Sequence, residues 1–241
     1  MKAFGGLLRV EVLLAARRGE TLLLTLGIPL GLLVFFSVVD VLPLPAGVED
    51  PVDFLAPGVL SLAVISTGMV QTAIGVAFER QYLVLKRLGA TPLGRPRLLG
   101  GKLAAVLLIE LVQVVVLVAA ASALGWSPTW MVGIALAAIA LGTSAFGGLG
   151  LLMAGRLRGE VTIAAANGLY LVLLLLGGIA FPLSELPDAL RAVAEVLPAA
   201  ALTELLQAAT SGETGAARWW LTLAAWAIAA PLAAARTFRW Q

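Results

Sequence analysis

Apolar runs of about 20 residues recur along this chain and dominate its composition. A helix of about 20 apolar residues crosses the ~30 Å hydrocarbon core of a bilayer. With 61% hydrophobic and 12% charged residues, a soluble fold of this length would expose too much apolar surface. We therefore expect an all-α, polytopic membrane protein with six transmembrane helices, at residues 21–39, 55–78, 98–124, 129–154, 161–180 and 219–235.

Lys and Arg divide unequally between the two sets of loops that these spans define. One set, with both termini, holds 14 of them, and the other holds only Arg191 and Arg218. Positive charge near span ends is retained on the cytoplasmic side, so we expect both termini to be cytoplasmic. Arg outnumbers Lys 13 to 3, and Ala, Gly and Leu dominate, as in proteins from GC-rich bacteria. We expect a multi-pass protein of the bacterial plasma (inner) membrane.

The residues that the chain lacks exclude several kinds of chemistry. It contains no Cys and no His, so thiolate nucleophiles, imidazole bases and the usual zinc or haem ligands are missing. Gly100-Gly101-Lys102 is followed by Leu103, whereas a P-loop requires Ser or Thr there. We expect no catalytic residues, no metal site and no cofactor in this chain, and no nucleic-acid partner, because basic residues interleaved with aromatics are absent. Any ATP and Mg²⁺ would be bound by a partner subunit.

We interpret residues 1–241 as a single transmembrane domain. Residues 1–20 form a cytoplasmic helix lying in the membrane surface, for which a short solvated leader is the alternative. Residues 21–180 hold spans one to five, with a part-helical cytoplasmic segment at about 81–97. Residues 181–218 are external, and residues 219–241 hold the last span and a cytoplasmic tail. The acidic, Pro-rich loop 40–53 lacks the ligand spacing of a calcium loop, so we interpret it as a solvated external loop.

A few polar residues interrupt the predicted spans. Glu110 is the costly one, because an ionised side chain in mid-membrane costs at least a few kcal/mol. It should be protonated, paired or facing a wet cavity, and Gln113 lies one helical turn away. Two interpretations remain open for Glu110: a polar feature of a transport path or proton-linked switch, or an interhelical hydrogen bond that fixes packing.

The segment between the second and third spans has an amphipathic pattern. Tyr82, Leu85 and Leu88 fall on one helical face, while the positive residues Arg80, Lys86 and Arg87 fall elsewhere. Thr91-Pro92 is typical of a helix cap followed by a first helical residue. This pattern indicates a helix that docks in a cytoplasmic groove. The alternative is that these positive residues only set the orientation of the chain in the membrane and lie on anionic lipid.

The connection between the fifth and sixth spans is long yet apolar. Its turn and helix-start residues include Pro182, Pro187 and Pro198. Leu186, Leu190, Val193, Val196 and Leu197 recur at helical spacing. We expect two short helices that dip into the outer leaflet, because irregular backbone at that depth must be buried against protein.

Two segments together resemble the permease subunits of ABC-2 type exporters, the group that includes daunorubicin-resistance (multidrug) permeases and polysaccharide exporters. The first comprises Glu79, Leu-Lys-Arg-Leu at 85–88, Ala-Thr-Pro-Leu at 90–93 and Gly101-Lys102. The second comprises Gly-Ile-Ala-Phe-Pro-Leu at 178–183, Leu-Pro at 186–187 and Leu-Pro at 197–198. The chain departs from the family pattern at Leu83 and Val84, where members often have Gly-Thr.

The resemblance implies a membrane subunit that exports an amphiphilic drug, lipid or lipid-linked substrate with ATP hydrolysed by a separate ATP-binding cassette subunit. It implies a second permease chain, identical or related, contacting around the first and fifth spans. The residues that it implies for ATPase coupling are Glu79, Arg80, Tyr82, Leu85, Lys86, Arg87, Leu88, Thr91 and Pro92. The external re-entrant motif is Phe181, Pro182, Leu186, Pro187 and Pro198. We select Thr67, Gln71, Glu110, Gln113, Asn167 and Tyr170 as candidates for the translocation path.

Two alternatives to a drug or lipid exporter remain. One is the haem-exporter-like B subunit of cytochrome c maturation, against which the 85–93 string argues. The other is a non-transporting membrane regulator or assembly factor that uses the same kind of ATPase.

Overall fold

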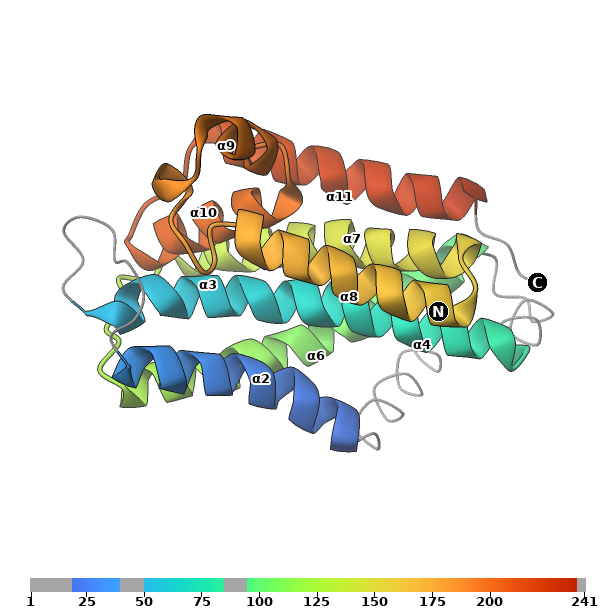
Figure 1. Ribbon diagram of the computed structural model, residues 1–241, viewed down its shortest axis with the longest axis horizontal. Coiled ribbons are helices and arrows are strands. Elements are labelled where there is room, and N and C mark those ends of the chain that lie inside the picture. Colours follow the sequence, from blue (N-terminus) through green and yellow to red (C-terminus); the bar gives the residue numbers. More distant parts are fainter. Residues whose placement is uncertain (1–18, 40–49, 85–94, 238–241) are drawn as a thin grey trace.

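The computed structural model describes residues 19–39, 50–84 and 95–237, and these form a bundle of helices (Figure 1). Within these ranges no strand is present, and a single isolated bridge joins Thr129 to Ser211. The predicted all-α class is confirmed. The predicted helix at 1–20 and most of the predicted helix at 81–97 lie outside the described residues.

The long helices lie roughly side by side along the bundle (Figure 1). They are α2 (Gly19–Val38), α3 (Pro51–Ile65), α4 (Thr72–Gln81), α6 (Arg95–Ala123), α7 (Val132–Arg156), α8 (Gly159–Leu176) and α11 (Ala217–Thr237). A π-helix, η1 (Ser66–Gln71), joins α3 to α4 without a break. The short elements are η2 (Leu183–Glu185), α9 (Asp188–Ala194) and α10 (Pro198–Thr210). We call the two ends of the bundle the α10 end and the α4 end.

Four of the described helices are long and apolar enough to cross a membrane: Pro51–Gln81, Gly100–Ala123, Val132–Arg156 and Gly159–Leu176. At 1.5 Å rise per residue, even 18 residues span about 27 Å. The apolar part of α2, Leu26–Val38, is shorter, and α11 has the length of a span but is less apolar. The chain is thus an integral membrane protein, and the total of six spans stays a prediction.

Two predicted boundaries differ from the structure by four residues, more than any other. The second span begins at Pro51 rather than at residue 55, so Asp53 lies in the first turn of α3 and not in the acidic loop. Pro fits there because the first helical N–H has no partner inside the helix. The fifth span ends at Leu176 rather than at 180, because Gly177 and Gly178 form a turn in which Gly178 has a φ of +71°.

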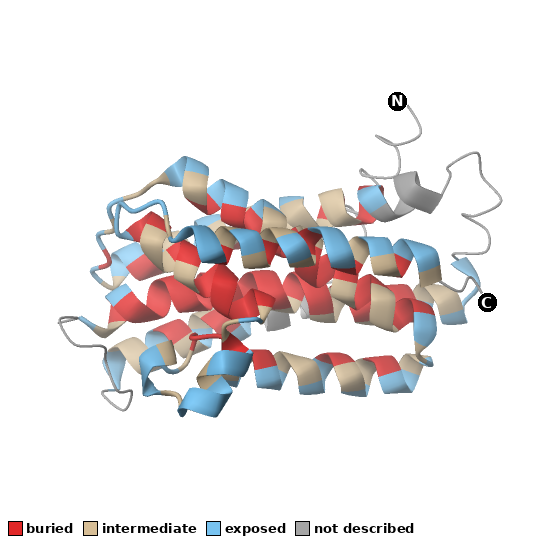
Figure 2. Cartoon of the chain, turned by 90° about the horizontal axis from the view of Figure 1, so that it is seen from above, coloured by how far each residue is buried: buried red, intermediate tan, exposed pale blue. Residues whose placement is uncertain are grey.

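Helix α3 forms the core of the bundle. Its residues are buried almost without interruption from Val52 to Ile65, and it packs against α2, α6, α7 and α10. Figure 2 shows the buried residues gathered along the centre of the molecule. A helix that is apolar all round is expected only where neighbours or lipid surround it.

Glycines on α7 allow two close helix contacts. A Cβ added at Gly150 would lie 2.6 Å from the carbonyl oxygen of Met69 in η1, and one at Gly148 would lie 2.5 Å from the nitrogen of Pro231 in α11. Small residues let helix backbones approach in membranes, where no hydrophobic effect drives helices together. These contacts place η1 and α11 on different faces of α7.

The two short helices expected between spans five and six are α9 and α10, which lie at the end where α3 begins (Figure 1). Pro198 is the first residue of α10, whereas Pro187 precedes α9 as its N-cap rather than starting it. Arg191 holds this region together: it donates to the carbonyls of Leu183 (3.0 Å), Leu186 (3.2 Å) and Ser184. Their location on the external side, dipping into the outer leaflet, stays a prediction.

We predict that Gly150→Ala destabilises the bundle by about 1–3 kcal/mol, because a methyl group would overlap backbone atoms that cannot move aside. Gly133→Ala on the same helix is the matched control, since nothing lies within 4 Å of its added Cβ. Thermal unfolding of both variants in detergent checks this. Equal melting temperatures for the two would contradict the close contact of α7 with η1.

Candidate functional site

The π-helix η1 interrupts the second span near its middle. Its wider turn is followed by a hydrogen bond from the Thr72 hydroxyl to the carbonyl of Thr67 (3.3 Å), five residues back. Single π-helical turns inside α-helices occur frequently at functional sites. This one directs Thr67 and Gly68 toward α6 and α7.

A cluster of polar side chains, which we call the central polar cluster, surrounds η1 and consists of Thr67, Glu110, Gln113 and Thr143. The Thr67 hydroxyl donates to Oε1 of Gln113 (2.7 Å), and the Thr143 hydroxyl contacts Oε2 of Glu110. All four side chains are buried, and Glu110 is 0% exposed. The cluster therefore joins η1, α6 and α7 within the membrane-spanning part of the chain.

The hydrogen bonds favour a protonated Glu110. The Thr143 hydroxyl has one hydrogen but lies within hydrogen-bond reach of both Glu110 and the carbonyl of Ile139 (2.8 Å). Both contacts are satisfied together when Thr143 donates to Ile139 and the carboxyl of Glu110 donates to Thr143. No Lys or Arg of the described ranges pairs with Glu110, and an isolated carboxylate here would be costly.

Three polar atoms at or near this cluster have no hydrogen-bond partner in the described part of the chain: Oε1 of Glu110 and Nε2 of Gln113 and Gln71. Oε1 of Glu110 faces Gly68, where an added Cβ would lie 3.1 Å from it. An orphaned polar atom in a low-dielectric interior costs about 1–3 kcal/mol. The cluster is thus not fully satisfied in this conformation.

The other two path candidates lie elsewhere. Asn167 and Tyr170 are on α8, where Asn167 is exposed and its amide donates to the carbonyl of Ile163 (2.9 Å). Only 17% of the apolar stretch of α8 is buried within the chain, against 72% for Pro51–Gln81. The structure brings Thr67, Glu110 and Gln113 together. On α8 it leaves Asn167 exposed, whereas Tyr170 is half-buried and packs against the hydrophobic core. A path role for any of them stays a prediction.

Two contacts fix the α4 end of the bundle. Lys102 forms an ion pair with Glu79 (2.7 Å), and the two side chains are 5% and 19% exposed. The Arg80 guanidinium donates to the carbonyl of Ala154 (2.7 Å), near the end of α7. The last turn of α4 is therefore attached to α6 and α7 at once.

The described residues that follow α4 are exposed. Tyr82 is 68% exposed and its ring stacks on Phe78, with 6.4 Å between ring centroids. Leu83 has a φ of +58°, a left-handed conformation that favours glycine. The resemblance described above has Gly as a frequent residue at this position. The remaining predicted coupling residues, Leu85, Lys86, Arg87, Leu88, Thr91 and Pro92, lie outside the described residues.

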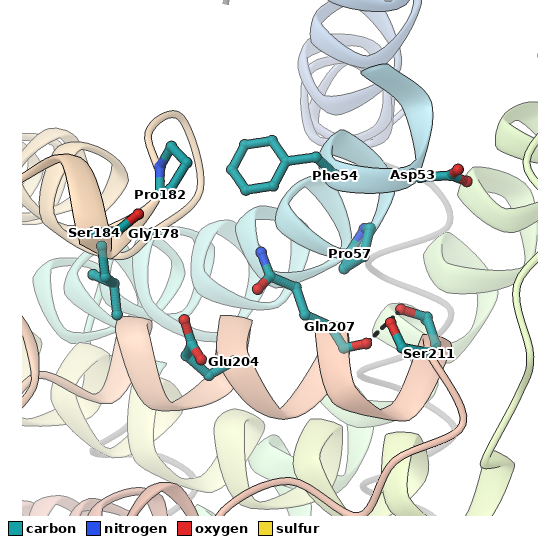
Figure 3. Close-up of a pocket in the computed structure, with 11 residues that line it drawn as sticks. Asp53, Phe54, Pro57, Gly178, Pro182, Ser184, Glu204, Gln207 and Ser211 are labelled. Atoms are coloured by element: carbon teal, nitrogen blue, oxygen red, sulfur yellow. Dashed lines mark hydrogen bonds between the residues drawn. The ribbon is translucent and has the colours of Figure 1, made fainter. Parts of the chain in front are cut away.

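The residues of the predicted re-entrant motif do not share one environment. Pro182 and Pro198 are buried, Leu186 is half-buried, and Phe181 and Pro187 are exposed. Pro182 borders a cavity of about 360 Å³ at the α10 end, shown in Figure 3.

Sequence reasoning missed three features of these sites. Thr143, the partner of Glu110, was not recognised, because a single Thr in a span usually forms a hydrogen bond with a backbone carbonyl of its own helix. The pairing of Lys102 with Glu79 was missed, although both flank the same loop and have opposite charge. Glu204, which points into the α10-end cavity, was counted only among the external acids.

The spanning helices and the interior polar cluster define a membrane-embedded protein. Residues 2–210 match the ABC-2 type transporter family, and the chain belongs to that family. The membrane domain of this family is the permease part of an ABC transporter and has no ATPase site of its own. It works with an ATP-binding cassette partner in a dimeric arrangement. No curated protein matches the chain.

We predict that Glu110→Gln stays within about 1 kcal/mol of the wild-type stability, because its amide can donate to Thr143 as a protonated carboxyl does. Glu110→Ala should lose about 2–4 kcal/mol through the contact and the cavity left behind. Chemical or thermal unfolding of both variants in detergent checks this. A Gln variant as unstable as the Ala variant would show that the charge itself is required.

Proposed function

We propose that this chain is the permease of an exporter that moves an amphiphilic drug, lipid or lipid-linked substrate out of a bacterial cell across the plasma membrane. Membership of the ABC-2 type transporter family is the observation that carries this proposal. ATP and Mg²⁺ are bound by the separate ATP-binding subunit. In the membrane both termini face the cytoplasm, so the α4 end is cytoplasmic and the α10 end is external.

Coupling takes place at the α4 end. The segment around 81–97 docks on the ATP-binding subunit through Tyr82, Leu85 and Leu88. The ion pair of Glu79 with Lys102 supports this role, because it links the two helices that flank the segment. When these two helices are held together, a displacement of the segment moves them as a rigid body, whereas a flexible loop would absorb it.

The displacement reaches mid-membrane through α4. Helix α4 continues directly into η1, and η1 contacts the central polar cluster. Movement of α4 would therefore act on the contacts of Thr67 with Gln113 and of Gly68 with Glu110. The unpartnered polar atoms of this cluster support a second arrangement in which they find partners.

The substrate passes between two permease chains that meet around α8. This is supported by the small buried share of α8 and by Asn167, a polar residue exposed at membrane depth. Polar residues inside spans almost always face protein or a water-filled cavity rather than lipid. An identical or a related second chain would satisfy this requirement equally well. The apolar composition of α8 suits an amphiphilic substrate better than a polar solute.

Reconstitution separates export from a regulatory role. The chain, purified in mild detergent with its bound subunits identified by mass spectrometry, is incorporated into lipid vesicles. Movement of a fluorescent amphiphile or lipid that depends on ATP supports the proposal. ATP hydrolysis that responds to the permease without movement of any substrate contradicts it and favours a regulator.

We predict that replacing Leu85 and Leu88 with Asp abolishes co-purification with the ATP-binding subunit, because the change removes an apolar docking face. Membrane insertion should be unaffected, because the segment lies outside the spans. The control replaces Leu85 and Leu88 with Met, which keeps an apolar docking face and should retain the ATP-binding subunit. Retention by the double Asp variant would refute the coupling assignment.

We also predict that Asn167→Cys chains are joined by a short bis-thiol cross-linker in membranes. The chain has no Cys, so the variant has one thiol. Val112→Cys on α6, at a position 63% exposed in the wild type, is the control and should stay monomeric. The dimer band is measured on denaturing gels. Cross-linking at Val112 but not at Asn167 would place the interface on α6 instead.

A further inference from the structure

The cavity at the α10 end has walls from three parts of the chain. The first turns of α3 contribute Phe54 and Pro57, the segment after α8 contributes Pro182 and Leu183, and α10 contributes Glu204 and Gln207. Its volume of about 360 Å³ lies in the range of small-molecule sites, about 300–1,000 Å³. None of these residues belongs to the central polar cluster or to the α4 end.

Glu204 and Gln207 lie one turn apart on α10, and their side chains point into the cavity beneath Phe54 (Figure 3). Their orientation is fixed because Leu202, Leu205 and Leu206 on the same helix are fully buried in the core. Neither side chain makes a hydrogen bond or ion pair with any described residue. The half-buried carboxylate of Glu204 has lost hydration, and the attraction of Arg218, which forms no ion pair with it, offsets that loss only in part.

The other residues that line the cavity favour an organic cation over a metal ion as the ligand of the Glu204 carboxylate. Phe54, Pro57, Pro182 and Leu183 present apolar surface, and an aromatic face attracts organic cations. A metal ion needs more ligands than one carboxylate and one amide, and the described residues contain no group of three or more His, Cys, Asp or Glu that would hold one. A negative charge on one wall of the cavity and apolar surface on the others fit an organic cation whose ammonium group is attached to an apolar part.

We propose that this cavity is a binding site for a small organic ammonium ion, with the positive charge on Glu204 and the apolar part against Phe54 and Pro57. Where the ammonium group has an N–H, the side-chain oxygen of Gln207 accepts a hydrogen bond from it. The carboxylate of Asp53, which also lines the cavity, adds to the negative potential. The site is complete within a single chain. It does not rest on the proposed export function and stands if the chain transports nothing.

The charged groups around Glu204 determine how binding depends on pH. Burial raises the pKa of Glu204, Arg218 lowers it, and Glu195 raises it. Arg218 lies 3.9 Å from Glu195 and over the ring of Trp219, and Arg191 is held by backbone carbonyls. A proton on Glu204 competes with the cation. Affinity should therefore fall on acidification, beginning at a higher pH than for an ordinary glutamate.

The test measures equilibrium binding of benzyltrimethylammonium to the full chain in detergent micelles. Glu204→Gln, which keeps the shape of the side chain, should weaken binding at least about tenfold, because it removes the negative charge that attracts the quaternary ammonium. Glu213→Gln is the matched control: it removes one exposed external carboxylate outside the cavity lining and should bind like the wild type. Equal affinity of the two variants would overturn the proposal.

Two further measurements on the folded wild type make the test independent of variant stability. Benzenesulfonate, similar in size but negatively charged, should not compete with benzyltrimethylammonium. Wild-type affinity should fall as pH is lowered, and Glu204→Gln should abolish most of that dependence. Competition by benzenesulfonate, or no binding of the ammonium by the wild type at millimolar concentration, would refute the site.

Discussion

The close contact between α7 and η1 is the constraint on which much of this bundle depends. Thr143, Gly147 and Gly150 lie on one face of α7, where an added Cβ at Gly150 would overlap the backbone of η1. The same approach brings Glu110 beside Thr143 and Gly68. Because hydrocarbon offers no hydrogen bonds, the buried carboxyl of Glu110 finds its partner on another helix only where helices come this close. Glycine packing and the burial of Glu110 are thus two consequences of one geometry.

That geometry also connects the two ends of the second span. Its α4 end is tied to α6 by Glu79 and Lys102 and to α7 by Arg80, while its α10 end forms part of the cavity with Phe54. Between them lies η1, the one π-helical segment in the described part of the chain and the place where the polar contacts gather. A displacement applied at the α4 end would act first on this segment, because its wider turn departs from regular α-helical geometry.

The sequence predicted part of the sites and missed the rest for identifiable reasons. Glu110 and Gln113 were recognised because charge and amide groups are costly in apolar spans. Thr67 was selected too, but its pairing with Gln113 was not predicted, and Thr143 was missed, since Thr is a common residue whose importance here comes from a neighbouring helix. At Leu83, where the resemblance has Gly as a frequent residue, the backbone has the left-handed conformation that glycine favours.

Sequence by itself determined the membrane class, the short helices α9 and α10 and the family, because hydropathy, proline positions and motif spacing are local properties. It did not determine which helices touch. Tertiary structure alone decided that Glu110 meets Thr143, that Lys102 meets Glu79 and that Glu204 faces a cavity rather than solvent. The physical reason is that helix packing in a membrane depends on shape fit between surfaces that are all apolar. Hydrophobic pattern, the strongest signal in a sequence, cannot distinguish a lipid-facing side from a protein-facing one.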